Sequence, residues 1–522
     1  MKRVAYFCME YGLNPDLRIH AGGLGILAGD ILKAAKEKEL NLVGVGALWT
    51  KGYAVQEIKD GEQVEHFPKQ NYDSLEEMDI SFSKYVNGEK VKFKVYKTEK
   101  FGNEPLYLLD TDLPENSESG KQLTEKLYIG SGKKYLLQQL ALGKAGLELV
   151  RRINFEPDFY HLNESDAVFV GLELLKERKG DKNFKEALRE TKERVRFTTH
   201  TPVEAGNPKY SYEVMKDVGL LEDFSVVELK RIGEKPFNLT LAGLRISGRA
   251  NGVSEKHKHV ARKMWSLHRR TADIVGITNG VHLGTWLSKG IKKAKDPEEL
   301  WEAHKEEKEK LLEKVDSDPD PETPLIGFAR RFVDYKRPDL LFWDEDKVEE
   351  VLKKANVVFS GKAHPNDEGG KKLVSRIVEE ARKRNSVMFL EDYNMSKAKY
   401  MTRGCDIWLS CPRPPEEACS TSVIKAAANG VLNLSTLDGW WAEACKHGKN
   451  GWQFGNGVEL KDEKKQDKHD AKSLYRVLLN EVIPKYRERE KWTKMMENSI
   501  ATARPEYTAS SLVDRYSEKL WS

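Results

Sequence analysis

The sequence predicts an α/β fold that is built on parallel sheets and divided into more than one domain. Short β-rich runs alternate with helical patterns along the chain, which is typical of parallel sheets covered by helices. In the second half the β-rich runs recur at intervals of roughly 20–30 residues, the spacing of βαβ units. The chain also has 522 residues, which is more than one hydrophobic core usually holds.

The clearest expected strands form two groups separated by a charged segment. The first group lies at 3–8, 42–48 and 194–199, and the second at 325–330, 355–360, 386–390, 406–410 and 431–434. Between the groups, a charged helix runs into prolines and acids that cannot continue a helix. We therefore expect a first domain at 1–287, a linker at 288–323 and a second domain at 324–485. The remaining residues, 486–522, are expected to form helices broken near Pro505.

Composition and charge argue against several classes of function. The 87 Lys and Arg nearly balance the 83 Asp and Glu, so a formal charge of +4 gives no broad field for nucleic acid. The sequence has no run of about 18 apolar residues, so we expect no membrane span. The apolar run near the N-terminus is too short for a signal peptide. The five cysteines are scattered without CxxC spacing, which favours a reducing cytoplasm and no metal site.

A glycine-rich segment at 20–30 is the first candidate site. Gly22 and Gly23 follow the first expected strand and precede apolar residues at helical spacing. A glycine turn that enters a helix lets backbone N–H groups approach an anion at the positive helix end. A tight strand-to-helix turn without a ligand is an equally open interpretation.

A basic segment at 327–337 is the second candidate. It places Arg330, Arg331, Lys336 and Arg337 directly after an apolar strand, at the carboxyl edge where α/β sheets bind ligands. The arginines can fork onto phosphate oxygens, and Lys336 supplies a compact charge. The alternative is a solvated basic face at the start of a helix.

The third candidate is the segment 417–430. Its hydroxyl residues at 420–422 are expected to cap a helix that continues through 426–428. Lys425 lies in the first turn of this helix with apolar neighbours, and a desolvated amine suits Schiff-base chemistry. By itself, a lysine on a helix is more often a surface residue.

Taken together and in this order, the three segments resemble the glycogen and starch (α-glucan) phosphorylases, particularly their compact prokaryotic form. The likeness extends over nearly the whole chain and includes the segments 160–165, 197–202, 249–254, 263–265, 277–282, 361–365, 389–393 and 437–443. The resemblance implies a GT-B arrangement, in which two Rossmann-like domains face each other across an active-site cleft. It also implies that the C-terminal helices cross back to the first domain.

The resemblance further implies a cofactor, pyridoxal phosphate, whose 5′-phosphate exchanges a proton with the substrate phosphate. Lys425 would hold the cofactor aldehyde as a Schiff base. The residues implied around the cofactor phosphate are Thr421, Ser422, Tyr393 and Arg330. Arg331 and Lys336, with the backbone of Gly22 and Gly23, would hold inorganic phosphate against the cofactor.

On the sugar side, the resemblance assigns glucosyl contacts to His200, Asn279 and Glu417, and places His161 and Asn163 behind them. By itself, a lone histidine after a strand is more often structural. The implied reaction is retaining phosphorolysis of an α-1,4-glucan from its non-reducing end with inorganic phosphate, which gives glucose 1-phosphate. The sequence leaves open whether the chain forms homo-oligomers.

Three residues depart from the family pattern. Ser420 stands where relatives carry glycine, Val423 where they carry glycine or asparagine, and Ile424 where they carry methionine. Two alternatives therefore stay open. One is a nucleotide-sugar-dependent glycosyltransferase of the same fold, similar to glycogen synthase, which does not need the lysine segment. The other is a catalytically inactive relative that binds glucan.

Overall fold

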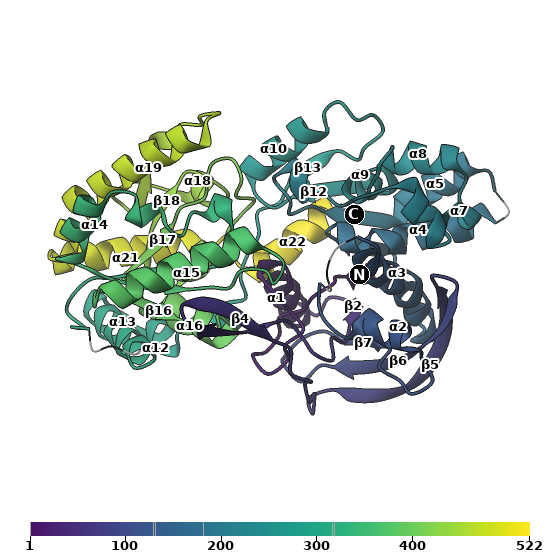
Figure 1. Ribbon diagram of the computed structural model, residues 1–522, viewed down its shortest axis with the longest axis horizontal. Helices are drawn as coiled ribbons and strands as arrows, with labels where there is room; N and C mark the ends of the chain where they lie inside the picture. The colour runs from purple at the N-terminus through teal and green to yellow at the C-terminus, as the bar shows by residue number, and fades with distance from the viewer. Residues whose placement is uncertain (1, 129, 131, 181, 316, 318) are drawn as a thin grey trace.

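The computed structural model describes residues 2–128, 130, 132–180, 182–315, 317 and 319–522, which form two α/β units. In Figure 1 the first unit, coloured purple to teal, lies on the right, and the second, green to yellow, lies on the left. Each unit is built on its own sheet, with helices packed around it. The predicted α/β class is confirmed, and the two Rossmann-like units form a GT-B arrangement.

The first sheet has the strand order β13-β12-β9-β8-β1-β2-β7-β6-β5. Neighbouring strands are parallel from β13 to β7, whereas β7, β6 and β5 are antiparallel. The strands are β1 (Val4–Phe7), β2 (Leu42–Ala47), β5 (Glu76–Val86), β6 (Glu89–Thr98), β7 (Leu106–Asp110), β8 (Phe159–Asn163), β9 (Val195–Thr198), β12 (Arg249–Gly252) and β13 (Ile274–Gly276). Strands β1, β2 and β9 confirm the three strands expected in this half.

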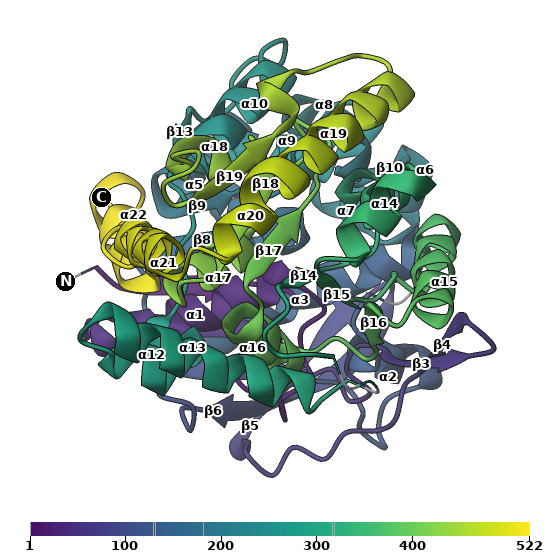
Figure 2. The same cartoon turned by 90° about the vertical axis from the view of Figure 1, so that its left-hand side faces the viewer.

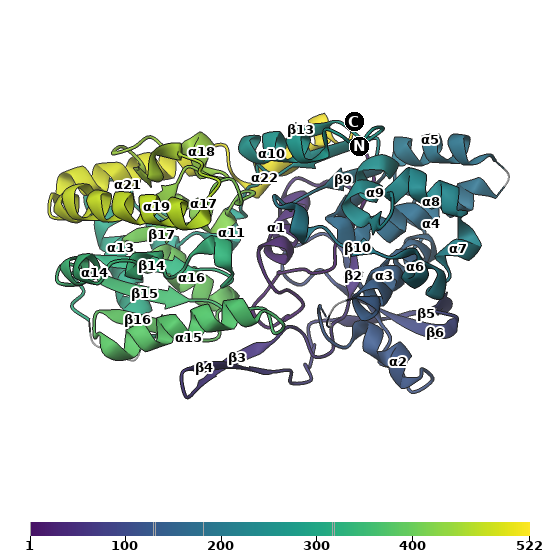
Figure 3. The ribbon, with the colours of Figure 1, turned by 45° about the horizontal axis from the view of Figure 1, so that its top comes forward.

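The helices of the first unit surround this sheet. They are α1 (Gly23–Glu37), α2 (Glu118–Lys121), α3 (Lys133–Arg152), α4 (Val168–Lys179), α5 (Phe184–Arg194), α6 (Tyr212–Asp217), α7 (Leu220–Asp223), α8 (Val226–Gly233), α9 (Leu239–Ile246) and α10 (Glu255–Trp265), with a small ladder between β10 (Lys209–Tyr210) and β11 (Phe237–Asn238). Helix α1 lies toward the second unit in Figure 3. Its residues Leu27, Ile31 and Leu32 recur at helical spacing and are buried in the first core.

The second sheet is parallel throughout and has the order β16-β15-β14-β17-β18-β19. Numbered along the chain this order is 3-2-1-4-5-6, the arrangement of a Rossmann fold. The strands are β14 (Leu325–Ala329), β15 (Asn356–Ser360), β16 (Val387–Leu390), β17 (Ile407–Ser410), β18 (Leu432–Thr436) and β19 (Gly451–Phe454). All five strands expected in this half are confirmed. Their continuous apolar runs reflect burial on both faces of the sheet.

Helices also surround the second sheet. They are α11 (Leu283–Trp286), α12 (Lys289–Lys293), α13 (Pro297–Leu312), α14 (Glu345–Leu352), α15 (Glu368–Lys383), α16 (Met395–Gly404), α17 (Thr421–Ala428), α18 (Trp441–Ala444), α19 (Glu463–Val477), α20 (Ile483–Tyr486) and α21 (Arg489–Ala503). Helix α13 lies in the segment expected to be a linker, but it packs against α16. Its Lys308 Nζ and His304 Nε2 lie 2.7 and 2.9 Å from the buried carboxylate of Asp406. This segment is therefore anchored to the second unit.

The chain ends by returning to the first unit. Helix α21 packs against α17 of the second unit, whereas α22 (Ala509–Lys519) packs against α1 (Figure 2). The gap between these helices confirms the break expected near Pro505. Leu512, Val513 and Tyr516 of α22 are part of the first core. Of the C-terminal helices, it is α22 that crosses back.

A hairpin that the sequence did not predict joins the units on another side. Strands β3 (Val55–Lys59) and β4 (Glu62–His66) extend from the first unit toward α15 (Figure 3). Gln56 Nε2 donates to the carbonyl oxygen of Gly361 over 2.9 Å, and the Ala363 N–H donates to Gln63 Oε1 over 2.9 Å. These short, half-exposed strands lack the continuous apolar run that marks a buried strand.

In the described part of the chain, no helix is long and apolar enough to cross a membrane.

The buried Asp406 cluster predicts a stability effect. Asp406→Ala leaves Lys308 as an unpaired buried charge, which should cost about 3–5 kcal/mol of folding stability. The midpoint of denaturant unfolding measures this loss. Lys305→Ala is the matched control, because Lys305 lies on the same helix and forms an exposed pair with Glu322. Equal midpoints for the two variants would contradict the prediction.

Candidate functional site

The order of the second sheet creates a crevice at one position. Connections from β14 and β17 leave in opposite directions, and such a switch point is where open α/β sheets bind ligands. The loop after β14 carries Arg330, Arg331 and Lys336, and the loop after β17 carries Glu417 and Ser420. The fold thus brings the basic segment and the start of the lysine segment together at a single edge.

A buried cluster of charges joins these two loops. Glu417 is 6% exposed; its Oε2 accepts a hydrogen bond from Lys336 Nζ and lies 3.1 Å from Arg330 Nη1. Burial raises the pKa of Glu417, but Lys336, Arg330 and Arg331 outweigh burial and hold it below its usual value. The carboxylate is therefore ionised at neutral pH.

Arg331 differs from its two cationic neighbours because it is exposed to solvent. It forms no ion pair with a described carboxylate. Partial burial of the Arg331 side chain lowers its pKa, whereas the phenol groups of Tyr335, Tyr53 and Tyr128 raise the pKa by a larger amount. Tyr53 and Tyr128 belong to the first unit, so groups from both units act on Arg331.

Lys425 lies in α17 and is 5% exposed. Its Nζ sits 3.7 Å from the ring centroid of Trp286 and donates no hydrogen bond to a described residue. Burial lowers the pKa of Lys425 to about 8, while Asp30 of α1 opposes the shift. A lowered pKa leaves more of this amine in the neutral form, which is the form that attacks an aldehyde.

The start of α17 corrects one expectation. Ser420 occupies the N-cap position, but its side chain does not cap the helix. The Ser420 hydroxyl instead accepts a hydrogen bond from Arg330 Nη2. As a result, the N–H groups of Thr421 and Ser422 donate to no described residue and remain open at the positive end of the helix, where anions are favoured. Thr421 and Lys425 are four residues apart and lie on one face of the helix.

Ser420 also adopts left-handed backbone geometry, with φ of 69°. This conformation costs an L-residue about 1–2 kcal/mol and costs glycine almost nothing. The backbone thus explains why glycine suits this position. The serine retains that geometry at some cost in energy.

The glycine turn forms a second open helix terminus. A Cβ at Gly22 or Gly23 would meet no atom within 4 Å, and neither residue has positive φ. The Gly22 N–H donates to Glu10 Oε2, whereas those of Gly23 and Leu24 donate to no described residue. Ile26, one turn later, belongs to the apolar cluster that contains α17. One apolar cluster therefore includes residues from both helices.

The polar residues expected on the sugar side fall into two groups. Asn279 Oδ1 is buried without a hydrogen-bond partner among the described residues, and the Asn279 backbone interacts with the thiol of Cys419. His200 instead contacts Asn163, whose Oδ1 lies 2.7 Å from His200 Nε2. Burial lowers the pKa of His200 to about 3, which keeps its ring neutral. In the described part of the chain His200 has no contact with the cationic cluster.

His161 is fully buried. Its Nε2 lies 2.7 Å from Thr198 Oγ1, and its Nδ1 accepts a hydrogen bond from Trp521 Nε1 over 3.0 Å. Both ring nitrogens are therefore occupied, and His161 anchors the C-terminal segment to the first sheet. Asn163 is also fully buried and donates to Cys8 Sγ. These two residues lie behind the site, so any effect on a ligand is indirect.

Comparisons with known proteins point to one family. Residues 341–478 match the carbohydrate phosphorylase family. The chain is 37% identical to the maltodextrin phosphorylase of Thermococcus litoralis, over 99% of this chain and 70% of that protein. It is 35% identical to the glycogen phosphorylase of Aquifex aeolicus, over 100% of this chain and 86% of that protein.

The chain belongs to the carbohydrate phosphorylase family. A glycogen synthase from Desulforudis audaxviator matches more weakly, at 23% identity over 68% of this chain and 68% of that protein.

The described residues fit the cofactor of the phosphorylase family, pyridoxal phosphate. An aldehyde needs a buried amine, and Lys425 supplies one without a hydrogen bond. A phosphate needs free donors, and the backbone N–H groups of Thr421 and Ser422 supply them. Arg330 adds positive charge, although its Nη1 also lies 3.1 Å from Glu417 Oε2. Tyr393 lies close enough that Arg330 lowers the pKa of its phenol, against the larger effect of burial. The described residues thus offer an amine for the aldehyde of the cofactor and hydrogen-bond donors for its phosphate.

Sequence reasoning missed two carboxylates that support the site. Glu10 accepts hydrogen bonds from the N–H groups of Ala21 and Gly22 over 2.6 and 3.0 Å, which fixes the glycine turn. Asp438 accepts a hydrogen bond from the Glu417 N–H over 2.8 Å, and burial raises its pKa to about 7. Neither residue has a local pattern that marks it, because its partners are distant in sequence or use only backbone groups.

The lowered pKa of Lys425 predicts a pH dependence for cofactor uptake. Only the neutral amine attacks an aldehyde, so uptake should become faster as pH rises through about 8. Cofactor-free protein is mixed with pyridoxal phosphate, and the rate of absorbance change is measured between pH 6 and pH 10 (about two units either side of the midpoint). Lys425→Ala controls for other lysines. A rate that still climbs toward the usual lysine pKa would contradict the shift.

The open space at Gly23 predicts a substitution that preserves the fold but impairs the site. Gly23→Ala adds a Cβ that meets no protein atom within 4 Å, and alanine has a higher helix propensity than glycine. We expect unchanged or higher thermal stability and weaker binding of inorganic phosphate, because the Cβ enters the space before the helix end. Calorimetric titration with phosphate measures the affinity. Undiminished affinity would refute the anion site.

Gly25→Ala is the contrasting control for this prediction. Its Cβ would lie 2.6 Å from Glu10 Oε2 and 2.7 Å from His20 Cβ, so this variant should lose stability instead.

Proposed function

We propose that this chain is an α-1,4-glucan phosphorylase. It removes glucosyl units from the non-reducing end of a glucan with inorganic phosphate, retains the anomeric configuration and releases glucose 1-phosphate. The observation that supports this most strongly is the pairing of two open helix ends, on α1 and α17, with a buried lysine and exposed Arg331. This set suits two phosphate groups and one aldehyde, a combination that phosphorolysis with pyridoxal phosphate requires.

In this proposal the chain's residues hold two anions close together. Lys425, Thr421, Ser422, Tyr393 and Arg330 hold the cofactor, which when bound supplies a phosphate that gives and takes a proton. Two unit charges 4 Å apart repel by about 4 kcal/mol at an effective dielectric constant of 20. Arg331, Lys336 and the N-terminus of α1 offset this repulsion and orient the substrate phosphate (with Gly22 and Gly23 providing the open space).

The proposal assigns Glu417 to sugar binding. A glycosidase uses two carboxyl groups about 5–9 Å apart, one of which is protonated. Glu417 is ionised and paired with Lys336 and Arg330, so it cannot donate a proton at neutral pH. An ionised carboxylate can accept hydrogen bonds from sugar hydroxyls. We assign a second sugar contact to Asn279, whose Oδ1 has no described partner, and place His200 at the rim, positioned by Asn163.

The buried Lys425 favours a phosphorylase over a nucleotide-sugar transferase, since the latter has no use for a desolvated amine at this position. The inactive relative is disfavoured because the cationic cluster is intact despite Ser420. A glucan and inorganic phosphate are therefore the proposed substrates.

We place the enzyme in the cytoplasm, since all five cysteines are free thiols, as expected in a reducing compartment.

The test incubates protein with maltodextrin, phosphate and pyridoxal phosphate and measures glucose 1-phosphate. Arg331→Ala should raise the KM for phosphate about 10- to 150-fold, because a charge-assisted hydrogen bond contributes about 1.5–3 kcal/mol. Cofactor content should stay at the wild-type level. Arg487→Ala, which removes an exposed arginine elsewhere, should leave the KM unchanged.

Other outcomes would overturn the proposal. Glucosyl transfer from a nucleotide sugar without phosphorolysis would establish the transferase alternative. A cofactor-loaded protein that releases no glucose 1-phosphate from any glucan length would establish the inactive one. Ser420→Gly would then show whether the serine is responsible, because glycine removes the hydroxyl that engages Arg330.

A further inference from the structure

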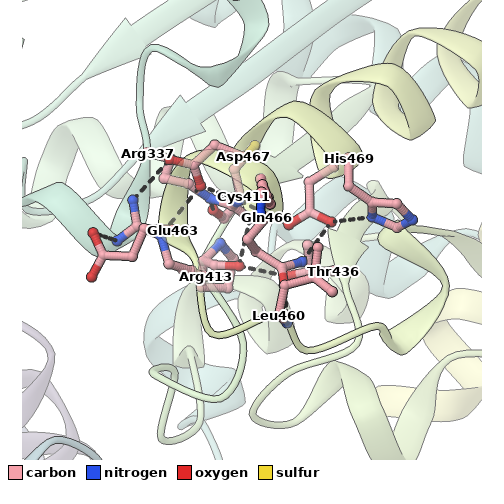
Figure 4. A network of polar contacts seen from close by, with 12 residues as sticks. Arg337, Cys411, Arg413, Thr436, Leu460, Glu463, Gln466, Asp467 and His469 are labelled. Atoms are coloured by element: carbon pink, nitrogen blue, oxygen red, sulfur yellow. Dashed lines mark hydrogen bonds and ion pairs between the residues drawn. The ribbon is translucent and has the colours of Figure 1, made fainter.

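A carboxylate outside the crevice connects the two loops that form it. Arg337 follows Lys336 directly, and Arg413 lies on the loop that leads to Glu417. Figure 4 shows both arginines converging on Asp467, which lies on α19. Three segments far apart in the sequence therefore meet at one side chain.

Hydrogen bonds of the Arg337 side chain fix the turn that carries Lys336. The guanidinium is buried, and its Nε and Nη2 donate to the carbonyl oxygens of Cys411 and Pro412 over 2.7 and 2.9 Å. Its Nη1 donates to Asp467 Oδ1 over 2.8 Å. The backbone of Arg337 has φ of 46°, so these contacts hold a left-handed residue that would otherwise be unfavourable. The position of Lys336 is thereby tied to the end of β17.

Arg413 makes the reciprocal connection from the other loop. Its N–H donates to the carbonyl oxygen of Tyr335 over 2.7 Å. Its Nε and Nη2 form a two-pronged contact with Asp467, over 3.2 and 2.9 Å, and its Nη1 donates to Asp334 over 2.8 Å. A forked arginine–carboxylate contact fixes direction as well as distance.

Asp467 itself has little freedom to move. Its side chain is 16% exposed, and the fully buried carboxylate of Asp470 lies beside it, 2.8 Å from Arg337 Nη1. Gln466 holds Asp470 through a 3.0 Å hydrogen bond. Helix α19 thus presents two fixed carboxylates to Arg337.

We propose that Asp467 is a positioning residue for the reaction, and that it sets the separation between the Lys336 loop and the Glu417 loop through Arg337 and Arg413. This inference rests on the proposed function, in which Lys336 binds phosphate and Glu417 binds the sugar. In the structure Lys336 and Glu417 also bind each other. When a phosphate draws Lys336 away from Glu417, the direct contact between these two side chains weakens. The contacts to Asp467 then keep the two loops at the same separation.

The test compares Asp467→Asn with Glu463→Gln in the cofactor-loaded enzyme. Both changes remove one negative charge from α19, but Glu463 is exposed and lies 3.7 Å from Arg413. For Asp467→Asn we expect kcat/KM for phosphate to fall about 10- to 100-fold, the effect of a misplacement of roughly 1 Å. Cofactor absorbance and the KM for maltodextrin should stay near wild-type. Glu463→Gln should match the wild-type enzyme.

Arg413→Lys separates geometry from charge. It keeps the positive charge but loses the fork, so it should lower kcat/KM for phosphate in the same way. If Asp467→Asn fails to fold, kcat/KM for phosphate is compared between Arg413→Lys and Glu463→Gln instead. A wild-type enzyme without phosphorolysis would refute the proposed function, and this inference with it.

The inference alone is overturned if the wild-type enzyme is active and Asp467→Asn performs like Glu463→Gln. It is also overturned if Arg413→Lys is unimpaired, which would show a pure charge effect. A loss of activity that only follows loss of bound cofactor would overturn it as well, since that would indicate general destabilisation.

Discussion

The burial of the Glu417 carboxylate is the constraint on which the site depends. An ionised carboxylate that is removed from water without partners costs several kcal/mol, so it persists only where cations meet it. Lys336 and Arg330 provide them from another loop. That requirement brings the loops after β14 and β17 into contact, and it concentrates positive charge at the switch point of the second sheet. An anion that enters the crevice meets charges already in place.

The two units contribute in complementary ways. The second unit supplies the cations and the lysine, whereas the first supplies the open end of α1 and the polar side chain of Asn279. Ile26 of α1 belongs to the same apolar cluster as Val423 and Ile424 of α17, so one cluster includes residues from the first turns of both helices. Each of these helix ends carries a partial positive charge.

Several features of the site lower the folding stability of the protein. Ser420 and Arg337 both have positive φ, and Lys425 is buried without a hydrogen-bond partner among the described residues. Strained backbone and desolvated charge commonly collect where a ligand binds. Around them the structure is firmly braced by the hairpin of β3 and β4, by α22 on the first core, and by the contacts among Arg337, Arg413 and Asp467 (Figure 4). Rigid surroundings allow the strained residues to persist.

The sequence by itself determined the local elements and much of the site's composition. Apolar runs predicted the buried strands, because a strand covered on both faces needs continuous apolar residues. The glycine turn, the four cations and Lys425 were visible because each stands directly beside such a strand or helix.

Only the tertiary structure decided the contacts between distant segments. It placed the Ser420 hydroxyl on Arg330 rather than on the helix end, enclosed His161 among aromatic rings beneath the C-terminal segment, and brought Asp467 to two arginines more than 50 residues away. Local periodicity reports which face of an element is buried. It carries no information on which partner buries it, because partner choice depends on strand order and on the packing of the whole chain.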